Sequence, residues 1–266
     1  FILWDEVHHQ TAESWSDVSM LADCPEVGFT ATPYRGTAKG TQEFRSIWGE
    51  PNWIYTFPDA VARGFVTLPE VTTVPLVDDD VIEVTGGEFQ VRSVEAETRS
   101  RLVELKTLIE SYPLDRATMV AVPTVATAQE LAAILAKSVV VTGDTSRTER
   151  NKAYADMLAC RKILIQVAVV GEGVDLAVRR IFDAAPTLSP VRWVQLFGRA
   201  TRPDGVSEYI CTNRNLLRHV YTLQGVIPAH QVAQSQAVFG LGTRSGQRAF
   251  GLEGLGRFKA NPLPMA

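Results

Sequence analysis

The second half of the chain shows a regular alternation of two hydrophobic periods. Short apolar runs predict buried strands at 117–122, 138–142, 162–167, 180–184 and 207–212. Segments with helical spacing of apolar residues lie between them, at 125–136, 146–158 and 191–198. Strands that alternate with helices in this way are typical of a parallel sheet with helices on both faces. We therefore predict an α/β domain over this half.

The first half has a less regular pattern. It predicts buried strands at 1–4 and 26–29, a helix at 12–22 and an extended segment at 68–77. A polar stretch follows, and then an amphipathic helical pattern runs from Val91 to Tyr112 and ends at Pro113. We place the domain boundary in the polar stretch. The predicted domains are a first lobe over 1–90, a second lobe over 91–225 and a C-terminal extension of unknown role over 226–266.

Composition excludes several classes of protein. The 266 residues are 45% hydrophobic and 21% charged, which is typical of globular domains with proper cores. A net charge of −4 provides no general attraction to nucleic acid, so any such contact must be a local patch. Three widely spaced cysteines indicate neither a disulfide framework nor a zinc site. No apolar run approaches transmembrane length and no signal peptide is seen, so we expect no membrane contact and a cytoplasmic location.

Candidate chemistry begins where the first predicted strand ends. This strand runs directly into Asp5 and Glu6, so two carboxylates lie at the end of the sheet where α/β proteins bind ligands. The alternative is a strand that simply becomes polar where it meets solvent. Three later stretches also lie at a predicted strand end or helix start: Thr30-Ala-Thr-Pro33, Gly171-Glu-Gly-Val-Asp175 and Gln195-Leu-Phe-Gly-Arg-Ala-Thr-Arg202.

Taken in order, these stretches resemble the motifs of superfamily 2 helicases and translocases. Asp5-Glu-Val-His8 resembles the DExH box, and the three later stretches resemble the third, fifth and sixth motifs, the last as Q-x-x-G-R-x-x-R. The resemblance extends from Phe1 to about Pro203. It is closest to the DNA-acting branch that includes type I and III restriction motor subunits and phage helicases. It implies an α/β fold of two RecA-like parallel-sheet lobes, the first incomplete and the second complete.

The resemblance also implies an ATP site that uses Mg²⁺. Asp5 would hold the metal through water, and Glu6 would act as the general base that polarises the attacking water. Arg199 and Arg202 would bring positive charge to the γ-phosphate, a role that suits the permanently charged guanidinium. Gln195 would contact the attacking water or the γ-phosphate. The alternative for the two arginines is an ordinary surface salt bridge.

Other residues take supporting roles in the same resemblance. Gly173 would allow close backbone approach to the nucleotide, and Asp175 would face the ribose or the other lobe. His8 would couple the DExH box to Gln195, with an ordinary strand-end histidine as the alternative. Thr30 and Thr32 would transmit closure of the lobes to the nucleic-acid side. Candidate nucleic-acid contacts, for which ordinary loop polarity is the alternative, are Arg35, Thr124, Gly143 and Arg147.

Two features depart from the family pattern. Val167 stands where many relatives have a phosphate-contacting Thr, so that contact is not expected here. The sequence also holds no G-x-x-x-x-G-K-S/T loop, because Gly36–Thr41 has the letters in the wrong order. Since the chain also starts within a predicted core strand, we expect it to be the later part of a longer protein. We expect this part by itself to hydrolyse ATP negligibly.

These patterns predict a portion of an ATP-dependent helicase or translocase that acts on DNA, with RNA as the alternative substrate. Two other interpretations compete with it: a non-hydrolysing nucleic-acid-binding module derived from a helicase, and an unrelated α/β nucleotide-binding protein. The acidic pair and the two arginines favour the enzyme, because a binding module has no chemical use for them.

Overall fold

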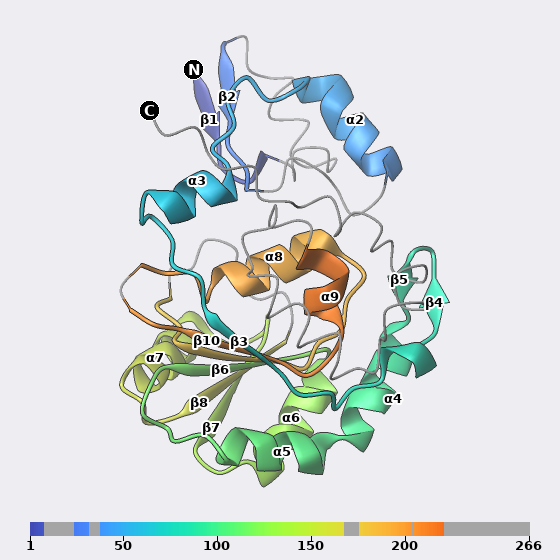
Figure 1. Ribbon diagram of the computed structural model, residues 1–266, viewed down its shortest axis with the longest axis vertical. Coiled ribbons are helices and arrows are strands. Elements are labelled where there is room, and N and C mark those ends of the chain that lie inside the picture. Colours follow the sequence, from blue (N-terminus) through green and yellow to red (C-terminus); the bar gives the residue numbers. More distant parts are fainter. Residues whose placement is uncertain (8–23, 32–37, 168–175, 204, 221–266) are drawn as a thin grey trace. The chain divides into compact units, whose positions relative to one another are not determined.

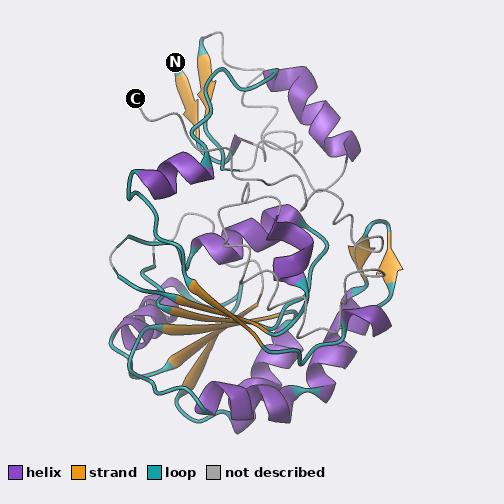
Figure 2. Ribbon diagram, in the orientation of Figure 1, coloured by secondary structure: helices purple, strands orange, loops and turns teal. Residues whose placement is uncertain are grey.

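The computed structural model describes residues 1–7, 24–31, 38–167, 176–203 and 205–220 (Figures 1 and 2). The chain divides into two compact units, Phe1–Tyr55 and Thr56–Ala266. The predicted helix at 12–22 and the predicted extension at 226–266 lie outside the described residues. None of the described helices is long and apolar enough to cross a membrane.

The first unit contains a pair of parallel strands and a helix. These elements are β1 (Ile2–Trp4), β2 (Glu26–Gly28) and α2 (Ala38–Trp48). The spacing of apolar residues along α2 turns Phe44 inward, where it is buried with Trp4 and Val7. A Cβ atom at Gly28 would lie only 2.8 Å from the Cγ2 atom of Val7, so the packing at the end of β1 requires glycine.

The second unit is built around a six-stranded parallel sheet. Its strands are β3 (Glu70–Thr73), β6 (Thr118–Val122), β7 (Ser138–Val141), β8 (Ile163–Val167), β9 (Arg180–Asp183) and β10 (Glu208–Cys211). They are arranged in the order β3-β10-β9-β6-β8-β7. Every residue of β6 and β9 is buried, as expected for central strands that are covered on both faces.

Helices cover both faces of this sheet. They are α3 (Phe57–Ala62), α4 (Val91–Ser100), α5 (Leu102–Glu110), α6 (Val125–Ile134), α7 (Arg147–Leu158), α8 (Pro190–Gly198) and α9 (Asn215–His219). Figure 1 shows α5 and α6 on one side of the sheet and α8 and α9 on the other. Leu105 and Leu131 pack in the core of the first side, whereas Met157, Trp193 and Phe197 pack in the core of the second. The predicted doubly wound α/β arrangement is confirmed.

One strand lies in a different domain from the one that the sequence pattern indicated. The predicted first lobe ended at residue 90, but β3 pairs with β10 in the sheet of the second unit, with Glu70 opposite Glu208. The compact units divide at Tyr55 instead. The physical reason is that this segment packs its apolar side chains on the cores of the second unit, Val71 on one face of the sheet and Val74 and Leu76 on the other, while β3 pairs with the backbone of β10.

The segment between β3 and α5 contains a small structure of its own. It consists of the 3₁₀ helix η2 (Asp79–Val81), the strands β4 (Val84–Thr85) and β5 (Glu88–Phe89), and α4. The strands form an antiparallel hairpin whose two turn residues, Gly86 and Gly87, both have positive φ angles, 62° and 82°. Such a turn favours glycine at both positions. We call residues 78–89 the hairpin segment.

The amphipathic pattern at 91–112 is divided between α4 and α5, which meet at Arg101. The division follows from two separate cores. Val94 of α4 is buried with Phe89 of the hairpin segment, whereas Leu105 and Ile109 of α5 are buried against the sheet.

Candidate nucleotide and nucleic-acid site

The predicted acidic pair lies at the carboxyl end of β1. Asp5 is exposed and Glu6 is partly buried, and the Glu6 backbone N–H donates to the Asp5 carboxylate at 2.9 Å. Glu6 has a φ angle of 49°, an unfavourable conformation for a residue with a side chain. The following Val7 N–H donates to the Phe29 carbonyl at 2.9 Å, which ties this turn to the end of β2. Because β1 and β2 are parallel, Thr30 follows β2 at the same edge of the strand pair.

The predicted Q-x-x-G-R-x-x-R residues lie on and just after α8. The helix begins at Pro190, and the Ser189 side chain accepts the Arg192 N–H as an N-cap. Trp193 and Phe197 are fully buried and fix which face of α8 meets the sheet. The three residues of the motif that are predicted to contact the nucleotide are partly buried, so each keeps part of its surface accessible to a ligand: Gln195, Arg199 and Arg202.

The environment of Arg199 is unusual for an arginine. Burial lowers its pKa, the nearby Tyr154 hydroxyl partly opposes this, and the positive charge of Arg202 lowers it further. The guanidinium nevertheless remains charged, because an arginine in water loses its proton only at very high pH. Two like charges therefore lie close together in a partly desolvated setting.

Three of the predicted nucleic-acid residues follow strands of the large sheet. Thr124 comes after β6 and caps α6, with its hydroxyl accepting the Thr127 N–H at 3.2 Å. Gly143 and Arg147 come after β7, and both are exposed. The Arg147 guanidinium forms no hydrogen bond or ion pair with any described residue. The structure thus brings Thr124, Gly143 and Arg147 to the same carboxyl edge of the sheet.

Five predicted site residues lie outside the described residues, and their roles remain predictions: His8, Thr32, Arg35, Gly173 and Asp175.

A buried carboxylate that sequence reasoning missed lies at the carboxyl end of β9. Asp183 is fully buried and accepts four hydrogen bonds, from the Tyr209 hydroxyl (2.6 Å), the Asn215 amide (3.0 Å), the Asn213 amide (3.2 Å) and the Ala185 N–H (3.2 Å). Burial raises the pKa of Asp183, and these four donors oppose the rise. The signal was available, because Asp183 ends an apolar strand just as Asp5 does.

A second cluster that was missed holds the loop before α8. Glu88 of the hairpin segment accepts the Leu188 N–H at 2.8 Å and the Thr187 hydroxyl at 3.4 Å. His219 of α9 bonds to the Thr187 carbonyl at 2.9 Å, and burial lowers the pKa of His219 to about 4. The neutral imidazole therefore donates its Nε2 proton to this carbonyl. The start of α8 is held from two sides, by the hairpin segment and by α9.

Acidic residues attach the hairpin segment to α9. The Asp79 carboxylate accepts from the Arg218 guanidinium at 2.6 Å and from the Arg214 N–H at 3.3 Å, and Asp80 forms an ion pair with Arg214. Asp79 is almost fully buried, so its pairing with Arg218 is needed to offset the cost of burying a charge. The sequence pattern shows only a polar stretch here and does not indicate these ion pairs.

Comparison with known proteins supports the class of the second unit. Residues 100–204 match the family model of the helicase conserved C-terminal domain. No curated protein matches the chain in sequence. The second unit has the α/β fold of a RecA-like helicase C-terminal lobe, with six parallel strands. The predicted RecA-like second lobe is confirmed.

Several solved structures share this fold. S. cerevisiae Dbp5 bound to RNA is 19% identical with a TM-score of 0.54, and the alignment covers 84% of this chain and 56% of Dbp5. The type ISP restriction-modification enzyme LlaBIII bound to DNA is 20% identical with a TM-score of 0.54, over 79% of this chain and 18% of that one. A fragment described as an HsdR subunit of a type I restriction enzyme from Vibrio vulnificus is 16% identical with a TM-score of 0.61, over 77% of this chain and 43% of the fragment. The chain therefore spans at most about half the length of these relatives.

Proposed function

We propose that this chain is the portion of an ATP-dependent helicase or translocase that supplies the arginine side of its ATP site. The observation that supports this most is the position of the Q-x-x-G-R-x-x-R motif. It lies on and just after α8, within the segment that matches the helicase C-terminal domain, and the partly desolvated Arg199 lies near the charge of Arg202. Arginines in such a setting stabilise the charge that develops on a transferring phosphoryl group.

The other half of the proposed ATP site is acidic. Asp5 would hold Mg²⁺ through water, and Glu6 would orient the attacking water as general base. The exposed Asp5 carboxylate and the partly buried Glu6 at the end of a parallel strand fit these roles, because both side chains lie at the edge where α/β proteins bind ligands. ATP would be the nucleotide, and its hydrolysis would drive relative movement of the two lobes.

We propose DNA as the nucleic acid, with the backbone passing the carboxyl edge of the large sheet. Thr124, Gly143 and Arg147 support this proposal because they gather at that edge, and the Arg147 guanidinium has no partner among the described residues. Contacts of this kind bind phosphates and do not discriminate between sequences. They suit a motor that must move along any strand.

The test is a comparison of Arg199→Ala and Arg199→Lys in a protein that contains this chain together with a phosphate-binding loop. DNA-stimulated turnover and ATP affinity are measured separately. We expect Arg199→Ala to reduce turnover by roughly 10³-fold or more with a much smaller change in affinity, and Lys to restore only part of the rate. Arg161→Ala is the matched control, because Arg161 is 75% exposed and precedes β8 at the opposite edge of the sheet.

Two results would contradict the proposal. Loss of ATP affinity with an unchanged maximal rate would make Arg199 a simple binding residue. DNA binding without any turnover, even with unaltered residues, would favour the alternative of a non-hydrolysing nucleic-acid-binding module.

A further inference from the structure

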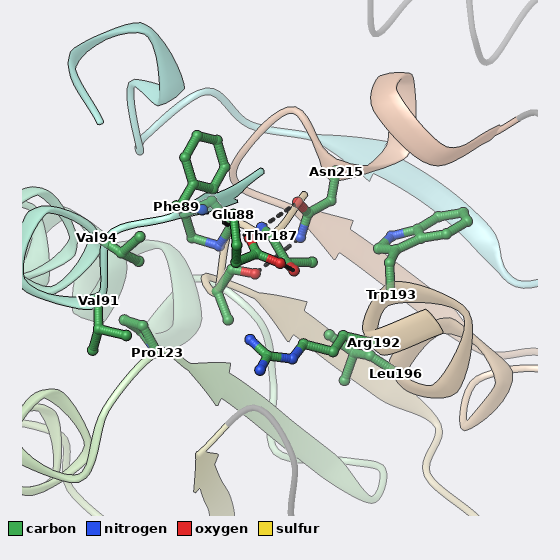
Figure 3. A pocket seen from close by; sticks show the side chains of 12 residues that line it. Glu88, Phe89, Val91, Val94, Pro123, Thr187, Arg192, Trp193, Leu196 and Asn215 are labelled. Atoms are coloured by element: carbon green, nitrogen blue, oxygen red, sulfur yellow. Dashed lines mark hydrogen bonds between the residues drawn. The ribbon is translucent and has the colours of Figure 1, made fainter. Parts of the chain in front are cut away.

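A pocket of about 170 Å³ lies at the carboxyl ends of β6 and β9, inside the second unit (Figure 3). Pro123 follows β6, and Ala185 to Thr187 follow β9. These two strands are neighbours in the sheet, but the segments that follow them run to opposite faces of the sheet. The helix after β6 packs on one face and the helix after β9 packs on the other. Such a point, where the winding direction reverses, is the usual place for a ligand in an open parallel sheet.

The walls of the pocket are mostly apolar. Figure 3 shows Phe89, Val91 and Val94 on one side, with Trp193 and Leu196 on the other. The pocket is smaller than the roughly 300–1,000 Å³ that hold a whole cofactor or drug-sized ligand. It therefore has room for a single flat ring system rather than for a complete nucleotide.

The polar groups inside the pocket are already engaged. Both carboxylate oxygens of Glu88 accept bonds from the loop before α8, one from the Leu188 N–H and one from the Thr187 hydroxyl. The Asn215 amide donates to Asp183 and to the Ala185 carbonyl. These groups are committed to holding the loop, so the interior carries the negative charge of Glu88 and offers few free donors.

Arg192 is the exception among the polar residues of the pocket. It is exposed, and its guanidinium forms no hydrogen bond or ion pair with any described residue. In Figure 3 its side chain extends from α8 toward the side of the pocket formed by Val91 and Pro123. The pocket thus combines the partly buried negative charge of Glu88, apolar walls and the positive charge of the exposed Arg192.

We propose that this pocket takes one base of a single-stranded nucleic acid, while Arg192 binds the phosphate attached to it. The proposal rests on the proposed function as a nucleic-acid motor. The charges determine the orientation of the bound nucleotide. Glu88 disfavours a phosphate inside the pocket, whereas the neutral base can enter between the apolar walls. The guanidinium of Arg192 is suited to the phosphate that remains outside.

The composition of the pocket predicts little discrimination between bases. Apolar and aromatic walls accept any base, and the internal hydrogen-bonding groups are already used. The site adds a cation to the carboxyl edge that already bears Thr124 and Arg147. We infer that a strand crossing this edge is held by its phosphates and also by one inserted base.

The experiment uses the 266-residue protein and a fluorescently labelled oligothymidylate of about 20 nucleotides, together with an abasic strand of the same length. Val91→Met narrows the mouth of the pocket without a change in charge, and Val91 is 64% exposed, so little stability should be lost. Its control is Val103→Met, because Val103 is 68% exposed on α5 and does not line the pocket. Arg192→Ala is compared with Arg161→Ala.

We expect Val91→Met to weaken binding of the thymidylate strand by roughly fivefold or more and to leave the abasic strand unchanged, because stacking of one base contributes at least that much. Arg192→Ala should lower the slope of log affinity against log salt by about 0.7, the contribution of one phosphate contact on a single strand. Both controls should resemble the unaltered protein in the fluorescence anisotropy titrations.

Two other outcomes distinguish a failure of the pocket inference from a failure of the proposed function. If the unaltered protein binds the strands, but Val91→Met and Arg192→Ala behave like their controls, the pocket inference is overturned and the proposed function stands. If the unaltered protein binds neither strand, nucleic-acid binding at this edge is itself refuted, and the pocket inference fails with it.

Discussion

Replacement of Asp183 by Asn should reveal how strongly the second unit depends on one buried carboxylate. The two oxygens of Asp183 each accept two hydrogen bonds, so all four donors face an acceptor: Tyr209, Asn213, Asn215 and the Ala185 N–H. An ionised carboxylate has only acceptors and fits this arrangement fully. An asparagine amide would instead present an NH₂ group to two of the four donors.

The magnitude follows from the groups left without partners. Each buried donor that loses its acceptor costs about 1–3 kcal/mol, and two are affected. Removal of the buried charge offsets part of this loss, since burial itself raises the pKa of Asp183 and thus disfavours the charged form. We expect Asp183→Asn to lower the free energy of unfolding by about 3 kcal/mol. For a domain of this size that corresponds to a decrease in Tm of roughly 6–12 °C.

The assay is urea unfolding at neutral pH, followed by circular dichroism. Tyr209→Phe removes one donor and leaves three, so a smaller loss of about 1–2 kcal/mol is expected. Asp144→Asn is the matched control at an exposed position and should change stability by less than about 0.5 kcal/mol. If Asp183→Asn is as stable as the unaltered protein, the carboxylate does not act as the shared acceptor. A gain in stability would show that the cost of burying its charge outweighs all four bonds.

Three further predictions concern pH, helix capping and catalysis. The free energy of unfolding should fall by about 3 kcal/mol as the pH drops from about 6.5 to about 4, because His219 is protonated first in the unfolded chain, while burial keeps it neutral in the folded state. In the His219→Gln variant, the free energy of unfolding should depend less on pH over this range. If the pH dependence is the same in the variant, His219 is protonated in the folded state over this range. Ser146→Ala should cost about 1 kcal/mol in urea unfolding, since it removes the capping box that Ser146 forms with Glu149 at the start of α7; a loss below about 0.3 kcal/mol would contradict this. In a protein that also has a phosphate-binding loop, Glu6→Gln should retain ATP binding and lose turnover by about 10²-fold, and an unchanged rate would exclude Glu6 as the general base.

Local hydrophobic patterns were sufficient to predict the type and approximate bounds of most helices and strands in the second unit. Buried runs such as Ile163–Val167 cannot expose their backbone groups or apolar side chains, so they form central strands in any compact fold of this chain. The predicted helix starts at 146 and 191 lie within one residue of the observed starts of α7 and α8, where Ser146 and Ser189 satisfy the first N–H groups. The local pattern alone therefore placed the candidate arginines at the end of a helix.

Pairing between strands that are distant in the sequence could not be predicted from local patterns. The segment that contains β3 has an extended pattern, but nothing in that pattern states which sheet edge it joins. Pairing with β10 depends on the cores of the second unit, against which Val71, Val74 and Leu76 pack once the sheet has formed. The predicted boundary near residue 90 differs from the division at Tyr55 for this reason.

The sequence by itself determined the α/β class, the approximate bounds of the helices in the second unit and the placement of Arg199 and Arg202 at the end of a helix. Only the tertiary structure decided what surrounds that helix. The four donors to Asp183 come from β10, from α9 and from two turns, and the loop before α8 is contacted by Glu88 of the hairpin segment and by His219 of α9. Hydrogen bonds between distant residues carry no periodic signal along the chain, because their partners meet only when the sheet brings their strand ends together.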